Sequence, residues 1–141
     1  MAPFNNFQSE NLIFIYTLAQ FKYCWALSVV SAKSYCFAIG VVAIYKILVG
    51  DKNEYVLSKQ LLRSGTAIGA LVREAQHSQS RADFVYKMNV ALKEANETAY
   101  WISLLNDTGY LSVEVFSSLS NDCDELLRLL VKIVKTSKGI K

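Results

Sequence analysis

The sequence predicts an all-α protein, an antiparallel four-helix bundle with up-down-up-down topology. Its 141 residues suit one domain that is long enough to bury a core. Hydrophobic residues make up 52% of the chain, with six glycines and one proline, which argues against disorder and against loop-rich β folds. Apolar residues recur at spacings of three and four between short polar breaks, which indicates helices joined by short connections.

The first two predicted helices are separated by a glycine. The first spans about residues 31–48 and ends at Gly50, a typical helix stop signal. The second starts near Lys52 and ends near Ser78. Its apolar face consists of Leu57, Leu61, Ile68, Val72 and Ala75.

Serine residues mark the starts of the third and fourth predicted helices. Ser80 followed by Asp83 resembles a capping box and opens a helix that reaches Asn106, before a turn around Gly109. Ser112 is the expected cap of the fourth helix. A seam on this last helix alternates steps of three and four, as in a heptad, and is apolar except at its last position: Phe116, Leu119, Cys123, Leu126, Leu130, Ile133 and Ser137.

Residues 12–30 form an apolar stretch that is long enough to raise the question of a membrane span. The residues before it contain no Lys or Arg, unlike a signal peptide, and Lys22 lies inside it, where hydrocarbon disfavours a charge. We expect residues 1–30 to be an apolar extension, with or without an extra helix, rather than a membrane anchor. The bundle domain is predicted over residues 31–139. Three cysteines without a CxxC pair fit a reducing cytoplasm.

Gly65 and Gly69 lie inside the second predicted helix, where each glycine costs about 1 kcal/mol relative to alanine. Small residues let backbones approach, so we interpret both as packing positions against another helix or another subunit. A phosphate loop would need a preceding strand and a Gly-Lys-Ser/Thr ending, which the sequence lacks. Trp101 is predicted to pack in the core or at an interface. Stacking on bases is the alternative for Trp101 and for tyrosines such as Tyr86 and Tyr100.

Basic residues gather on two predicted helix faces. The net charge is +3, but residues 33–93 carry nine basic and four acidic side chains, residues 94–125 none and seven, and residues 126–141 five and none. The candidate nucleic-acid-binding residues lie on the second and fourth helices: Lys52, Lys59, Arg63, Arg73, Arg128, Lys132 and Lys135. Two merged rows would match the phosphates of a nucleic acid. The alternatives are ordinary solvated faces, or basic faces that meet the acidic residues of a neighbouring subunit.

Neither a catalytic site nor a cofactor site is predicted. The single histidine, His77, follows no nucleophile motif. Glu94 and Glu97 lie one helical turn apart, but a ferritin-like metal pair needs Glu-x-x-His motifs on facing helices. We therefore expect no enzymatic activity, no metal and no cofactor.

Five segments together carry a family resemblance: SYCFAIGVVAIYKIL (34–48), EYVLSKQLLRSGTAIGALVREA (54–75), SQSRADFVYKM (78–88), ALKEANETAYWISLL (91–105) and SLSNDCDELLRLLVKIVKTSK (118–138). They resemble the bacterial four helix bundle family, which includes the 23S rRNA intervening sequence proteins. The resemblance implies a ring-like homopentamer. A similar protein is the accessory factor of diversity-generating retroelements, which engages nucleic acid and a reverse transcriptase. Gly40 and Leu71 depart from the residues usual in the family.

The leading hypothesis is a non-enzymatic homo-oligomer that binds RNA or DNA through its backbone phosphates. The competing hypothesis is a structural or adaptor homo-oligomer whose partner is another protein, such as a reverse transcriptase. In the first case the seven basic residues above supply the binding charge, and sequence preference is weak because phosphate contacts carry no base code.

Overall fold

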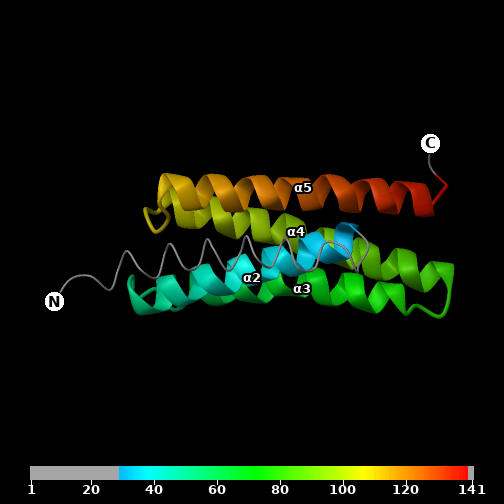
Figure 1. Cartoon of the computed structure of the whole chain (residues 1–141), viewed down its shortest axis with the longest axis horizontal. Coiled ribbons are helices and arrows are strands. Elements are labelled where there is room, and N and C mark those ends of the chain that lie inside the picture. The colour runs from blue at the N-terminus through cyan, green and yellow to red at the C-terminus, as the bar shows by residue number, and fades with distance from the viewer. Residues whose placement is uncertain (1–28, 140–141) are drawn as a thin grey trace.

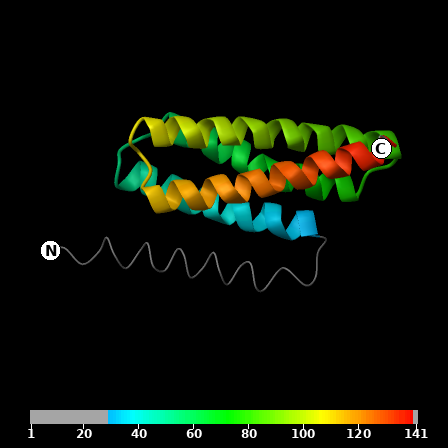
Figure 2. The same ribbon diagram turned by 90° about the horizontal axis from the view of Figure 1, so that it is seen from above.

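The computed structural model describes residues 29–139, where four helices follow one another: α2 (Val29–Gly50), α3 (Leu57–Gln76), α4 (Arg81–Asp107) and α5 (Val113–Ser137). Each helix runs antiparallel to the one before it (Figures 1 and 2). The described part of the chain contains no strand. The predicted all-α four-helix bundle is confirmed, while the predicted N-terminal extension lies almost wholly outside the described residues.

Each helix contacts two others around the bundle. α3 packs between α2 and α4, and α4 packs between α3 and α5. α5 closes the bundle on α2 through the smallest of the four contacts. The backbones of the diagonal pairs, α2 with α4 and α3 with α5, do not approach each other closely.

The composition of α2 would also suit a membrane-spanning helix, by its length and hydropathy. In the bundle, its inner face supplies Phe37, Val41 and Leu48 to the core. These side chains are almost completely buried against the other helices. Packing in the core therefore accounts for the apolar inner face of α2.

α3 begins at Leu57, so the expected start near Lys52 is wrong. Residues 51–56 form the connection instead, with Asn53 at a left-handed φ of 52°. The buried Glu54 carboxylate closes the helix start by accepting the backbone N–H groups of Val56 at 3.0 Å, Leu57 at 2.8 Å and Ser58 at 2.6 Å. Burial alone raises the pKa of Glu54, but these hydrogen bonds together lower it. A glutamate four residues before Ser58 thus replaces the Ser, Thr, Asp or Asn usual at a helix start.

The predicted caps of α4 and α5 are confirmed. The Ser80 hydroxyl accepts the N–H of Asp83 at 3.1 Å, and the Ser112 hydroxyl accepts the N–H of Val115 at 3.2 Å. Between the two helices, Gly109 adopts a φ of 82°, which favours glycine. Local sequence therefore positions both ends of the α4–α5 connection.

The core follows the predicted apolar rows of α3 and α5 with one shift. Leu119, Cys123, Leu126 and Leu130 are buried as expected, and Val134 is buried in place of Ile133, which is only half-buried. A straight helix with 3.6 residues per turn drifts from a seven-residue repeat, so the buried row moves by one residue over about two heptads. On α3 the buried apolar positions are Leu61, Ile68, Val72 and Ala75.

The two glycines of α3 lie against α2 of the same chain. A Cβ added at Gly65 would lie 2.8 Å from Cγ2 and 2.9 Å from Cγ1 of Val41, closer than real contacts allow. A Cβ added at Gly69 would lie 3.3 Å from the backbone oxygen of Ser34. The missing side chains therefore let the α2 and α3 backbones approach each other within the bundle.

Candidate nucleic-acid interface

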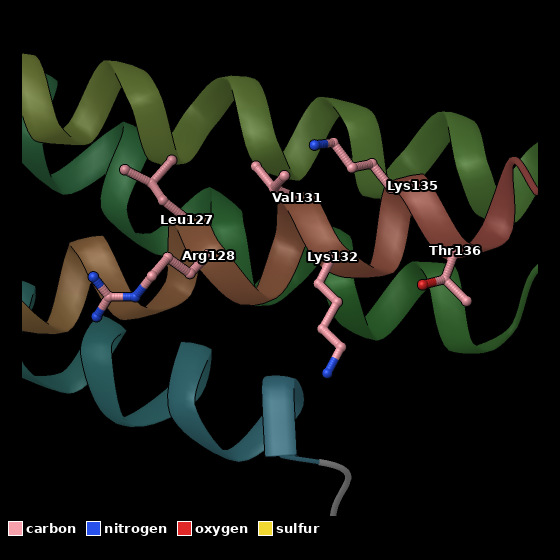
Figure 3. A pocket seen from close by; sticks show the side chains of 6 residues that line it. All are labelled: Leu127, Arg128, Val131, Lys132, Lys135 and Thr136. Carbon is pink, nitrogen blue, oxygen red and sulfur yellow. The ribbon is translucent and has the colours of Figure 1, made fainter. Parts of the chain in front are cut away.

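The C-terminal half of α5 carries an open groove of about 440 Å³. Apolar and basic side chains line it together: Leu127, Arg128, Val131, Lys132, Lys135 and Thr136. Figure 3 shows that Leu127, Val131 and Lys135 point to the side of α4, whereas Arg128 and Lys132 point to the side of α2. All three predicted basic residues of α5 thus surround one hollow in the surface.

These three cations are free of carboxylate partners within the described residues. The ion pairs formed among residues 29–139 join Lys33 to Glu125, Arg63 to Glu94 and Glu97, and Lys87 to Asp83. None of them uses Arg128, Lys132 or Lys135, and all three side chains are exposed. An incoming phosphate can pair with them without breaking an intramolecular bridge, which is the arrangement that favours anion binding.

Arg63 differs from the α5 cations because it is paired with two carboxylates of α4. Its guanidinium lies across the α3–α4 contact, with Nη1 at 3.3 Å from Glu94 Oε2 and Nη2 on Glu97 Oε1. The hydrogen bond to Glu97 is the main cause that raises the pKa of Arg63, and the same bond lowers the pKa of Glu97. The charge of Arg63 is therefore neutralised by two carboxylates that come from another helix.

Trp101 belongs to the same α3–α4 contact. Its indole Nε1–H donates to Glu97 Oε1 at 3.1 Å, and its half-buried ring packs against the core. The Tyr100 ring meets it edge to face, with centroids 4.9 Å apart. Trp101 is thus held inside the chain, where it positions the acceptor that binds Arg63.

The other predicted basic residues are not part of the α5 groove. Lys52 sits in the connection between α2 and α3, at the end of the bundle away from the α5 groove (Figure 1). Lys59 and Arg73 are exposed on α3. Because α3 and α5 are diagonal in the bundle, the two basic rows stand on helices that are not neighbours.

The antiparallel topology brings a different basic segment to α5. Arg81, the first residue of α4, donates from Nε to the backbone oxygen of Ser137 at 2.9 Å, so the basic start of α4 lies beside the basic end of α5. The exposed Lys138 follows directly. This juxtaposition cannot be seen when each helix is considered separately. It could have been predicted by combining the charge counts along the chain with the antiparallel order of the helices.

The acidic segment of the chain lies in the opposite half of the bundle. Its members are in the later part of α4 and the first half of α5: Glu94, Glu97, Asp107, Glu114, Asp122, Asp124 and Glu125. Two of them hold Arg63, and Glu125 holds Lys33 at 2.7 Å across the α2–α5 contact. The bundle is therefore polarised along its long axis, with excess positive charge where α4 begins and α5 ends.

The cysteines and the histidine take structural positions. Cys123 is buried with its Sγ 3.5 Å from the backbone oxygen of Ala95, and burial raises the pKa of its thiol to about 12. Cys36 is buried as well, and His77 caps the end of α3 through its backbone. Within residues 29–139, groups of three or more potential metal ligands are absent.

Comparison with known proteins places the bundle in a family. A family model described as 23S rRNA-intervening sequence protein matches residues 28–132. The chain belongs to this family. The match begins one residue before α2 and ends within α5, so it covers three helices and most of the fourth, but not Lys135 and Thr136 of the groove.

A solved structure of the same kind supports the fold. It is a protein of unknown function from the S23 ribosomal protein family of Bacteroides thetaiotaomicron, 54% identical to this chain with a TM-score of 0.75. The similarity covers 76% of this chain and 99% of that one. None of the curated proteins compared with the chain matches it.

Proposed function

We propose that this member of the 23S rRNA-intervening sequence protein family binds nucleic acid through the basic end of α5. The observation that carries the proposal is a set of three cations around one groove, Arg128, Lys132 and Lys135, which have no carboxylate partner among residues 29–139. The start of α4 adds Arg81 beside the last residue of α5, Ser137. The protein acts without catalysis, in the cytoplasm, by binding RNA or DNA.

Backbone phosphates are the proposed contacts. Lysine and arginine on a helix face bind phosphate without reading bases, so affinity is expected to depend strongly on salt and weakly on sequence. The family name supports RNA as the first ligand to test.

The test compares charge removal at the two ends of the bundle. Lys132→Gln with Lys135→Gln removes two cations from the groove, and Lys46→Gln with Lys52→Gln removes two exposed cations from the opposite end. Fluorescence anisotropy with labelled RNA is recorded at several salt concentrations. The groove variant is expected to bind more weakly and to reduce the slope of log K against log salt by about 1.4 to 1.8.

The opposite-end variant has the same net charge, so it controls for long-range attraction. It is expected to keep most of the affinity and the slope. Equal losses in both variants, or no loss in either, would contradict a localised interface on α5.

An oligomeric adaptor is the second candidate function. It is favoured by exposed apolar side chains at the loop end of the bundle, where Val56 is 70% and Val113 is 78% exposed. Both connections, residues 51–56 and 108–112, lie at this end in both views (Figures 1 and 2). Such side chains fit contacts with another subunit or a protein partner such as a reverse transcriptase, and the family resemblance implies a pentamer.

Light scattering on the full chain and on the Val56→Ser, Val113→Ser variant tests the adaptor. A multimer that dissociates in the variant supports an interface at this end. A monomeric mass for the unsubstituted chain would exclude the homo-oligomer.

A further inference from the structure

The outer face of α2 is more apolar than a helix at the edge of a bundle requires. Phe37, Val41 and Leu48 mark the side of α2 that points into the core. A step of about 100° between helical residues places five residues in the middle of the helix on the opposite side, which we call the outer face of α2: Tyr35, Ile39, Val42, Ala43 and Lys46. Lys46 is the one charged residue among these five, whereas a surface helix normally shows polar residues on this side. The composition therefore fits a helix that is covered on both sides.

The neighbouring helices contact α2 on its inner side. α3 approaches it at Val41 and Ser34, and α5 reaches it at Lys33. These three positions lie within about 60° of Phe37 around the helix axis. Figure 2 shows α2 at the edge of the four described helices, and Tyr35 of its outer face is 40% exposed. The outer face of α2 thus has no helical neighbour among residues 29–139.

The residues directly before α2 have the composition that this face requires. Residues 12–28 contain a single charged side chain, Lys22. Four of their large apolar residues recur at steps of four, three and four, the spacing of one helix face: Phe14, Leu18, Phe21 and Trp25. The family match begins at residue 28, so this segment lies outside the part of the chain that matches the family model.

The length of the segment suits the length of the face. Residues 12–28 join α2 directly at Val29, so a return along α2 needs only a short turn. A turn of about three residues leaves about 14, which as a helix span about 21 Å and reach the level of Ala43. Glu10 would then come to the far end of the face, where its carboxylate can meet Lys46.

We propose that residues 12–28 pack on the outer face of α2 of the same chain and cover its apolar side chains. A second copy or a lipid surface could also offer apolar contacts. A segment attached to the start of α2 is present at an effective concentration in roughly the millimolar range, which favours it over both. The inference goes beyond the proposed function, because the α5 groove shares no residue with this face.

Tryptophan fluorescence of the full chain tests whether the segment is packed. Trp25 and Trp101 are the two tryptophans of the chain, so the Trp101→Phe variant reports on Trp25 alone. Trp25 is expected to emit at shorter wavelength, and to be quenched less by acrylamide, in the folded protein than in urea. Ile39→Lys and Val42→Ser are each expected to shift its emission to longer wavelength and to increase quenching. Equal quenching with and without urea, or shielding that requires phosphatidylcholine vesicles, would overturn the inference.

Tyr86→Lys is the matched control for a new lysine on the surface. Tyr86 is 67% exposed on α4, the helix diagonal to α2. This variant is expected to leave the emission of Trp25 unchanged, and a shift as large as that of Ile39→Lys would contradict a position on the outer face of α2. Circular dichroism of each variant verifies that the bundle is folded.

An amine-reactive cross-linker separates the same chain from a second copy. In the unsubstituted chain, Lys22 is expected to be joined to Lys33 or Lys46, and mass spectrometry of the peptides detects the link. A Lys22→Arg chain coexpressed with a Lys33→Arg, Lys46→Arg chain can form such a link only between two copies, and none is expected. A link in the coexpressed sample would show that a second copy supplies the segment. Absence of the link in the unsubstituted chain would also overturn the inference.

Discussion

The close approach of α2 and α3 at Gly65 gives a measurable prediction. In Gly65→Ala the new Cβ would lie 2.8 and 2.9 Å from the two γ-methyl groups of Val41, which is completely buried. Valine is branched at Cβ and has little rotamer freedom in a helix, so it cannot turn away. The two helices must move apart, or the side chain must leave its rotamer.

Two opposing effects determine the size of the change. Alanine is favoured over glycine inside a helix by about 1 kcal/mol, and overpacking a core costs about 1–3 kcal/mol. Gly65→Ala is therefore expected to lower the free energy of unfolding by about 0–2 kcal/mol. In a Val41→Ala background the methyl groups are gone, so the same change is expected to raise the free energy of unfolding by about 1 kcal/mol. The coupling between the two positions is then about 1–3 kcal/mol.

Urea unfolding followed by circular dichroism measures the four members of this cycle at one protein concentration. Gly50→Ala is the control, because a Cβ at Gly50 meets no atom within 4 Å. It is expected to leave stability unchanged or slightly raised. The reasoning is refuted if Gly65→Ala stabilises equally in both Val41 backgrounds, since helix propensity alone would then account for it.

Three further predictions concern the cap, the ion pair and the buried thiol. Glu54→Gln is expected to lower the free energy of unfolding by about 1–2 kcal/mol near neutral pH, which thermal unfolding would measure. The folded state favours the ionised carboxylate. The difference between the two proteins is therefore expected to disappear as the pH falls through the lowered pKa of Glu54. Arg63→Met is expected to leave RNA affinity nearly unchanged in anisotropy measurements, and a large loss would show that Arg63 leaves its carboxylate partners to bind phosphate. Cys123 is expected to resist iodoacetamide in the folded protein at pH 8 and to react with it in urea, and peptide mapping would detect the label. Rapid labelling without urea would contradict the burial of the thiol and its pKa of about 12.

Helix spans and most of the core were predictable because their signals are local. Ser80 and Ser112 each bond a backbone N–H three residues ahead, so a short sequence window contains the whole cap. The periodic apolar rows of α3 and α5 identify their buried faces in the same way. The exception in α5, where Val134 replaces Ile133, arises from accumulated helical drift over about two heptads.

The start of α3 was not predictable from the usual capping residues. The buried Glu54 performs the cap from outside the helix, and this arrangement depends on the left-handed turn at Asn53. Residues such as Lys52 and Leu57 have sequence patterns that fit a continuous helix. Lys52 therefore belongs to the connection between α2 and α3 and not to the basic face of α3.

The amino-acid sequence determines on its own that this chain makes four amphipathic helices with a segregated charge, since periodicity, caps and composition act over a few residues. Only the tertiary structure decides which charges are available. Arg63 and Arg128 look alike along their helices, yet Arg63 meets carboxylates 31 and 34 residues away on α4, whereas Arg128 meets none among the described residues. Partners so far apart in the chain come together through antiparallel packing, which also joins the basic start of α4 to the basic end of α5.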